Sequence, residues 1–233
     1  MKVYGISDLH LSFQLDKPMY IFGTIWKNYE NKIAENWKKK VKEEDIVIIA
    51  GDISWATYLK EAVEDFRFID NLPGKKIILK GNHDYYFDTK TKLERFFESN
   101  NFNTISVLHN NAIDLNEEYI LCGTRGYGKD ELMKDADKIS KREQTRLKLS
   151  LDLGKKIQNE YLEKGINKKI LVAMHYPPFE YEYDKILEEY KVYKCIYGHL
   201  HGFGHSKIKE GNINNVNYVM VSVDYTNFDV IEL

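Results

Sequence analysis

Short runs of consecutive apolar residues recur along the chain and predict buried β-strands. Unbroken runs of this kind are typical of strands that are covered on both faces of a sheet. The predicted strands are Lys2 to Ser7, Asp45 to Ala50, Lys75 to Lys80, Tyr119 to Gly123, Lys169 to Met174 and Val192 to Tyr197. Most of these runs are followed directly by polar residues whose side chains can bind metal ions or act in catalysis.

Between the runs, apolar residues recur at the spacing of one face of a helix. In the segment from Phe22 to Val41, Ile25, Tyr29, Ile33 and Trp37 stand four residues apart, which predicts a helix with one buried stripe. The other predicted helices are Tyr58 to Leu72, Thr89 to Ser99, Asp130 to Lys164 (one helix or two) and Glu182 to Tyr190. Strands that alternate with helices imply crossover connections and a largely parallel sheet.

The C-terminal stretch follows a different pattern. Strand-like segments at Phe203 to Lys209, Asn217 to Val223 and Phe228 to Leu233 are separated by turn residues, which predicts an antiparallel meander. No internal repeat, low-complexity tract or linker divides the chain. We therefore expect one α/β domain that spans residues 1–233.

Composition and charge narrow the classes of function. Of the 233 residues, 43% are hydrophobic and 30% are charged, and the formal net charge is -2. This balance argues against a nucleic-acid partner and against a polybasic membrane patch. The two cysteines, Cys122 and Cys195, lie in apolar runs and are predicted to be buried free thiols. The oligomeric state is left open.

The chain carries no sign of targeting to a membrane. The N-terminal residues from Met1 to Asp8 hold no apolar core of a signal peptide. No apolar run approaches the roughly 20 residues that span a bilayer. We expect a cytoplasmic protein with no membrane partner.

The residues that follow the predicted strands have the side chains of a metal site. They are Asp8, His10, Asp52, Asn82, His83, Asp84, His175, His199 and His201. Ligands of open α/β sheets bind beyond the carboxyl ends of the strands, so these side chains can converge. Carboxylate and imidazole together favour Mn, Fe or Zn over Mg²⁺ or Ca²⁺. The two oxygens of Asp52 can bridge two cations, and cations about 3.5–4 Å apart can share a hydroxide that attacks a phosphoryl group in line.

Five sequence blocks resemble, in order, those of the calcineurin-like metallophosphoesterase superfamily. The blocks are Asp8-Leu9-His10, Gly51-Asp52, Gly81-Asn82-His83-Asp84, His175 and Gly198-His199-Leu200-His201. The resemblance implies an α/β fold in which a β-sandwich of mixed sheets is flanked by helices and carries the metal site at the carboxyl ends of the strands. It implies a phosphoric ester hydrolase with two transition-metal ions and a bridging hydroxide nucleophile.

The resemblance also assigns roles to individual residues. It gives one metal ion to Asp8, His10, Asp52 and His201, and the other to Asp52, Asn82, His175 and His199. It implies that His83 is not a ligand and instead donates a proton to the leaving group. It implies that Asp84 orients the ring of His83.

The substrate class is narrowed by departures from one branch of the superfamily. Ser/Thr protein phosphatases usually carry a second acidic residue after the aspartate of the second block, where this chain has Ser54-Trp55-Ala56. The third block ends in Asp84, where those phosphatases have glutamate. These departures favour a microbial phosphohydrolase that acts on a phosphomonoester or phosphodiester of a small molecule or nucleotide. A Ser/Thr protein phosphatase, a nuclease and a non-catalytic metal-binding interaction module remain alternatives.

Features outside the blocks carry weaker signals. Arg125 follows a predicted strand and lies among glycines, where its guanidinium can hold a phosphate oxygen or can serve as a surface residue. Arg142 and Arg146 are expected on a solvated helix face, and Trp55 either packs in the core or flanks the site. The region 123–164 is longer than a crossover needs, and we hypothesise that part of it caps the site and selects the substrate.

Overall fold

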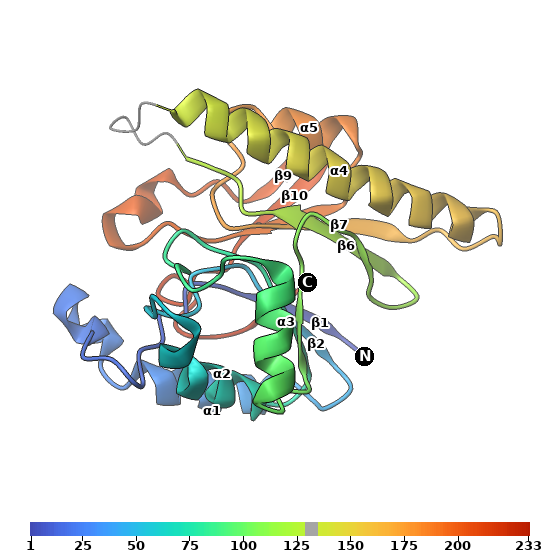
Figure 1. Cartoon of the computed structure of the whole chain (residues 1–233). Helices are drawn as coiled ribbons and strands as arrows, with labels where there is room; N and C mark the ends of the chain where they lie inside the picture. The colour runs from blue at the N-terminus through green and yellow to red at the C-terminus, as the bar shows by residue number, and fades with distance from the viewer. Residues whose placement is uncertain (129–134) are drawn as a thin grey trace.

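Two mixed β-sheets pack face to face and are enclosed by helices on their outer sides (Figure 1). The structure, a computed structural model, describes residues 1–128 and 135–233. The first sheet has the order β11 (Ile231–Glu232), β1 (Val3–Ile6), β2 (Ile46–Ile49), β3 (Lys75–Ile78), β4 (Ile105–Val107). The second has the order β5 (Ile113–Asp114), β6 (Tyr119–Thr124), β7 (Lys169–Met174), β8 (Lys194–Tyr197), β10 (Val216–Met220), β9 (Gly211–Ile213). Strands β1 to β4 are parallel, as are β6, β7, β8 and β10, while β5, β9 and β11 pair antiparallel at the edges.

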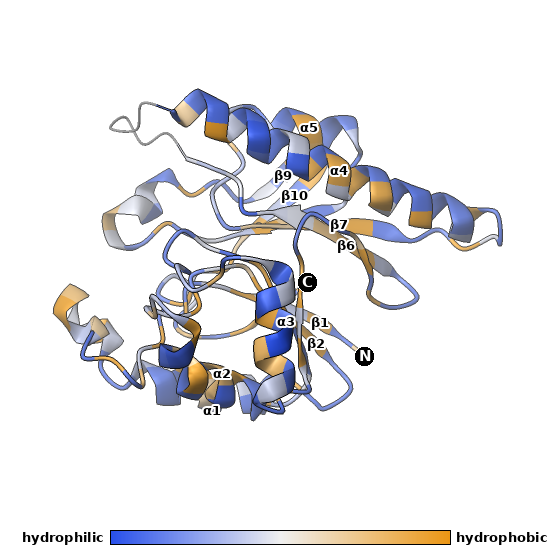
Figure 2. Ribbon diagram, viewed as in Figure 1, coloured by the Kyte–Doolittle hydropathy of each residue, from blue (hydrophilic) through white to orange (hydrophobic). Residues whose placement is uncertain are grey.

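Each sheet has its own layer of helices (Figure 1). Helices α1 (Tyr29–Lys40), α2 (Val63–Asp70) and α3 (Lys90–Ser99) cover the first sheet, and α4 (Ala136–Leu162) and α5 (Tyr183–Glu189) cover the second. Four short 3-10 helices complete the described elements: η1 (Met19–Phe22), η2 (Thr24–Trp26), η3 (Leu59–Glu61) and η4 (Gly202–Lys207). In Figure 2 the apolar residues of the strands and helices lie mainly toward the interior of these layers.

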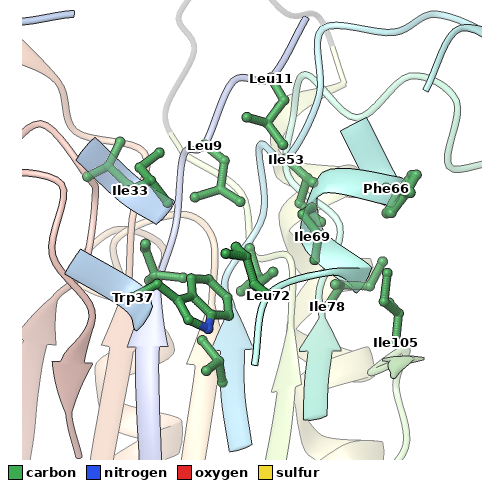
Figure 3. Packing of buried hydrophobic residues seen from close by; sticks show 14 of the residues in the cluster. Leu9, Leu11, Ile33, Trp37, Ile53, Phe66, Ile69, Leu72, Ile78 and Ile105 are labelled. Carbon is green, nitrogen blue, oxygen red and sulfur yellow. The ribbon is translucent and has the colours of Figure 1, made fainter. Parts of the chain in front are cut away.

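The strands have continuous apolar runs because both of their faces are buried. In β2, Val47 and Ile49 pack under the helices, whereas Ile46 and Ile48 face the second sheet. Figure 3 shows the helical side of this arrangement, where Ile33 and Trp37 of α1 and Phe66 and Ile69 of α2 meet the first sheet. Burial of this apolar surface stabilises the sandwich and fixes the carboxyl ends of the strands relative to one another.

Several predicted elements are wrong in extent or pairing. The helix predicted from Tyr58 to Leu72 is the 3-10 helix η3 followed by the shorter helix α2. The helix predicted from Phe22 begins only at Tyr29, because Gly23, with a φ of 141°, and Asn28, with a left-handed φ of 54°, both interrupt the helical path. The C-terminal meander is also wrong: residues 202–207 form η4, β10 runs parallel to β8, and β11 joins the other sheet beside β1. Alternating apolar residues identify a strand but do not specify which sheet edge it joins.

Much of the region 123–164 forms a helical layer of the sandwich. Residues 136–162 form the single helix α4, whose buried Leu147 and Leu151 pack against the second sheet. Residues 129–134 lie outside the described part of the chain. The hypothesis that part of 123–164 caps the site stays a prediction. Cys122 and Cys195 are free and buried, as predicted. None of the helices in the described part of the chain combines the length and apolar character that a bilayer-spanning segment needs.

Candidate metal centre

The seven ligands predicted from the sequence lie together at the carboxyl ends of the central strands. Asp8 and His10 follow β1, Asp52 follows β2, Asn82 follows β3, His175 follows β7, and His199 and His201 follow β8. Because β1, β2 and β3 are parallel to one another, as are β7 and β8, each sheet delivers its polar residues at one edge. The two sheets bring these edges together.

One group of ligand atoms forms around His201. Its Nε2 lies 3.2 Å from Oδ1 of Asp8 and 3.3 Å from Nε2 of His10. The same His10 nitrogen lies 3.9 Å from Oδ2 of Asp52. Ligand atoms that bind one ion at about 2.1 Å lie roughly 3–4 Å from one another, so these atoms fit a single cation.

A second group forms around His175. Its Nε2 lies 3.4 Å from Oδ2 of Asp52 and 2.7 Å from Oδ1 of Asn82. Nδ1 of His199 lies 2.9 Å from the same Asn82 oxygen. Ligand atoms of Asp8, Asp52 and His175 all lie within 4.8 Å of one another. Asp52 therefore faces both groups.

Hydrogen bonds behind the ligands fix the direction of their free atoms. The carbonyl of Ala50 lies 3.0 Å from Nδ1 of His175, which orients the ring so that Nε2 is directed at the cluster. Oδ1 of Asp224 lies 2.8 Å from Nδ1 of His201 in the same way. Oδ2 of Asp8 accepts hydrogen bonds from the hydroxyl of Ser222 at 2.6 Å and from the backbone N–H of His199 at 3.0 Å.

Asp224 and Ser222 were missed in the sequence. Both follow β10, which ends at Met220, whereas the strand predicted from the sequence continues to Val223 and includes Ser222. The antiparallel meander predicted for the C-terminal strands does not indicate that their ends meet those of the parallel strands. The parallel pairing of β10 with β8 brings them to the cluster.

Backbone strain is concentrated at the ligands. Asp8, His10, Asp52 and His199 have positive φ angles of 62°, 46°, 51° and 73°. Such angles are uncommon for residues other than glycine and are found often at functional sites. A Cβ on Gly81 would lie 2.1 Å from Oδ1 of Asp52, so this neighbour of the cluster must be glycine.

The buried carboxylates Asp8 and Asp52 set the electrostatics of the cluster. Burial alone would lower the pKa of His175, but the charge of Asp52 raises it to about 9. Burial lowers the pKa of His10 to about 4 and that of His199 to about 3. His10 and His199 are therefore neutral at pH 7, which is the form that binds metal ions. The donor set of two carboxylates, one amide oxygen and four imidazoles fits a transition-metal site.

His83 lies at the rim of the cluster. Its backbone N–H donates to Oδ1 of Asp52 at 2.8 Å, and its half-buried ring lies 5.7 Å from the ring of His10 between centroids. Trp55 packs 4.6 Å from the ring of His83 and 4.8 Å from that of His10, so it flanks the site. Burial lowers the pKa of His83, and the charge of Asp52 opposes this shift.

The hydrogen bonds of Asp84 differ from the prediction that it orients the ring of His83. Its buried carboxylate accepts hydrogen bonds from the backbone N–H groups of Asp52, Ile53 and Gly81 at 3.0, 2.9 and 2.7 Å, and from the hydroxyl of Tyr86 at 2.9 Å. These donors occupy the carboxylate that was expected to hold the ring of His83. Asp84 instead ties together the loops after β2 and β3, which carry Asp52 and Asn82.

Arg125 lies apart from the ligand cluster. Its carbonyl accepts a hydrogen bond from the backbone N–H of His175 at 3.1 Å, but its side chain lines a different pocket together with Arg142 and Arg146. The two helix arginines thus face a pocket as well as solvent. A role for Arg125 in substrate binding stays a prediction.

Comparison with known proteins identifies a family. A family model described as calcineurin-like phosphoesterase matches residues 1–203, a range that includes all seven predicted ligands. No curated protein gives a significant match to the sequence.

Solved structures similar to this chain have low sequence identity to it. A protein of unknown function from Aquifex aeolicus is 17% identical, with a TM-score of 0.48 over 99% of this chain and 95% of that chain. The phosphopantetheinyl hydrolase from Mycobacterium tuberculosis is 11% identical, with a TM-score of 0.51 over 100% of this chain and 95% of that chain. At 11% identity, the second comparison shows a common fold.

Proposed function

Since the chain belongs to the calcineurin-like phosphoesterase family, and is therefore a phosphoesterase, we propose that it hydrolyses phosphate esters with two metal ions bound at this cluster. The substrate is a phosphomonoester or phosphodiester of a small molecule or nucleotide. The convergence of Asp8 and Asp52 with four imidazoles and the amide oxygen of Asn82 carries the proposal.

The position of Asp52 favours two metal ions over one, because its carboxylate lies near ligand atoms of both groups. Its Oδ2 is 3.9 Å from Nε2 of His10 in one group and 3.4 Å from Nε2 of His175 in the other. We propose that Asp8, His10, Asp52 and His201 hold one ion, and that Asp52, Asn82, His175 and His199 hold the other. The four imidazoles favour Mn, Fe or Zn.

The ions would supply Lewis-acid chemistry, lowering the pKa of a water molecule and neutralising charge on the phosphoryl oxygens. The side chains of the protein would supply proton transfer and positioning. We propose that His83, which lies at the rim and outside both ligand groups, donates a proton to the leaving oxygen. Trp55 restricts the ring of His83 by packing against it.

Removal of metal ions tests the proposal directly. We expect protein treated with a chelator to lose hydrolysis of p-nitrophenyl phosphate and bis-p-nitrophenyl phosphate, and to regain it with Mn²⁺. Initial rates on the two esters, measured beside the metal content, will separate monoesterase from diesterase activity. Hydrolysis that persists in metal-free protein, or fully loaded protein that hydrolyses neither ester, would contradict the proposal.

Asp224 is expected to support metal binding through His201. The substitution Asp224→Asn removes the charge that orients and polarises this imidazole, and we expect metal affinity to fall roughly 10- to 100-fold. Titration of the metal-free protein with Mn²⁺ measures the effect. Asp229→Asn is the matched control, because the carboxylate of Asp229 pairs with Lys40 at 2.6 Å instead. Equal affinities in the two variants would show that Asp224 does not act on the metal site.

A further inference from the structure

A second pocket lies beside the metal centre, where the ends of β3 and β6 meet α4. Its volume is about 390 Å³, which falls within the range of roughly 300–1,000 Å³ for small-molecule sites. Four cationic side chains line it: Lys80, Arg125, Arg142 and Arg146. We call it the basic pocket.

One of the two carboxylates that line the basic pocket is buried and fully engaged. Oε2 of Glu143 accepts a hydrogen bond from the hydroxyl of Thr124 at 2.7 Å. Its Oε1 forms an ion pair with Nη1 of Arg146 at 2.6 Å. Glu143 therefore holds Arg146 in place and balances the charge of that arginine.

Arg142 shares the same carboxylate, because its Nε lies 3.8 Å from Oε1 of Glu143, so this one charge faces two arginines. Asp88, the second carboxylate, pairs with Lys92, which lies outside the pocket lining. In the described part of the chain, no carboxylate lies within ion-pair distance of the side chains of Arg125 or Lys80. Like charges held together repel one another, so an anion bound between them would be stabilised.

We propose that the basic pocket binds a tetrahedral oxyanion of the phosphate class. Three arginines present planar guanidinium groups, whose forked donors match the oxygens of phosphate, and Lys80 adds a compact charge. The cations come from three different segments, namely the loops after β3 and β6 and the helix α4. A ligand among them would therefore contact side chains from separate parts of the fold.

The basic pocket is connected to the metal centre through two loops. Lys80 stands two residues before Asn82, which limits their Cα atoms to about 7 Å apart. The carbonyl of Arg125 holds the backbone N–H of His175. The bound group can thus be a free inorganic anion or a second phosphate of the substrate. The second alternative rests on the proposed function.

Sulfate binding tests the basic pocket separately from catalysis. We expect Mn²⁺-loaded protein to bind inorganic sulfate, and Arg125→Gln and Arg142→Gln each to weaken that binding about tenfold, because each removes charge-assisted hydrogen bonds. Neither variant leaves a buried carboxylate unpaired, since Arg146 still pairs with Glu143. Arg95→Gln removes an exposed arginine outside the pocket and should bind sulfate as the unmodified protein does. Calorimetric titration gives the affinities.

Asp52→Asn separates this inference from the proposed function. This variant should keep its sulfate site even where hydrolysis is lost, because the basic pocket does not include Asp52. Sulfate affinity that is equal in Arg125→Gln, Arg142→Gln and the unmodified protein would overturn the inference. Sulfate binding that is lost only in Asp52→Asn would also overturn it, because the anion would then occupy the metal centre.

Kinetics distinguish the two sources of the anion. If the pocket holds a second phosphate, Arg125→Gln should lower kcat/KM for a bisphosphorylated substrate about tenfold relative to its monophosphorylated analogue. If it holds a free anion, added sulfate should change the rate on the monophosphorylated substrate, and this response should disappear in Arg125→Gln. The absence of both effects would overturn a role for the pocket in the reaction.

Discussion

Replacement of Asp52 by asparagine is expected to lower kcat/KM for p-nitrophenyl phosphate at least about 10³-fold. Metal ions contribute several kcal/mol to stabilising the transition state, and each 1.36 kcal/mol corresponds to a factor of ten. The amide of asparagine has one oxygen acceptor in place of two and carries no charge. It can still accept the backbone hydrogen bond from His83, so the loss should come from metal binding rather than from the loop.

The expected loss has a second signature in metal content. Asp52 faces both groups of ligands, so Asp52→Asn should lower the occupancy of at least one ion as well as the rate. Elemental analysis of the purified protein, combined with initial rates over a range of Mn²⁺ concentrations, measures both. Metal content and activity equal to those of the unmodified protein would exclude a shared carboxylate at this position.

Asp45→Asn provides a matched control for this experiment. Asp45 is also buried and lies just before β2, at the opposite end of the strand from Asp52. Its carboxylate accepts backbone hydrogen bonds from Lys2 and Lys42 at 2.7 and 2.9 Å. We expect Asp45→Asn to reduce the free energy of unfolding while leaving metal content and kcat unchanged. The comparison separates loss of a buried aspartate from loss of a metal ligand.

The predicted ligands could be recognised because each follows a short apolar strand. The carboxyl ends of parallel strands meet at one sheet edge, so a strand ending at Asp8 and another ending at His175 can be expected to deliver side chains to one place. Helix boundaries are less predictable, as α1 shows: the apolar stripe continues upstream of Tyr29, but Asn28, directly before the helix, has a left-handed φ of 54°.

The contacts between loops could not be predicted in the same way. The family resemblance implies that Asp84 orients the ring of His83, yet its carboxylate accepts from backbone N–H groups 30 and more residues away, such as those of Asp52 and Ile53. These donors become available only when the loops after β2 and β3 pack together. Asp224 was missed for a related reason, because its position depends on the sheet to which β10 belongs.

Substitution of His83 by alanine is expected to lower kcat by roughly 10²- to 10⁴-fold for an alkyl phosphate, which is the usual contribution of a general acid. The effect should be much smaller for p-nitrophenyl phosphate, because nitrophenolate leaves without needing a proton. Metal content should not change, since the His83 ring belongs to neither ligand group. Rates on the two esters, measured with elemental analysis of the same preparations, provide the test.

Tyr85→Ala is the control for damage to the rim. Tyr85 is exposed, and its ring lies 6.2 Å from that of His83 between centroids, so its loss alters the same edge without removing the proposed acid. This variant should show no dependence on the leaving group. Equal losses on both esters in His83→Ala would contradict proton donation and would instead favour a role for the imidazole in stabilising phosphoryl charge.

The surroundings of His83 explain why its protonation can respond to the substrate. Its ring packs against the neutral indole of Trp55, and burial lowers the pKa of His83 in the free protein. The carboxylate of Asp84 is committed to backbone donors and does not fix the charge of the ring. A phosphoryl dianion bound beside the imidazole would raise the pKa of His83 and favour the protonated form. The acid would then be charged mainly when substrate is present, so the leaving-group dependence should appear in kcat.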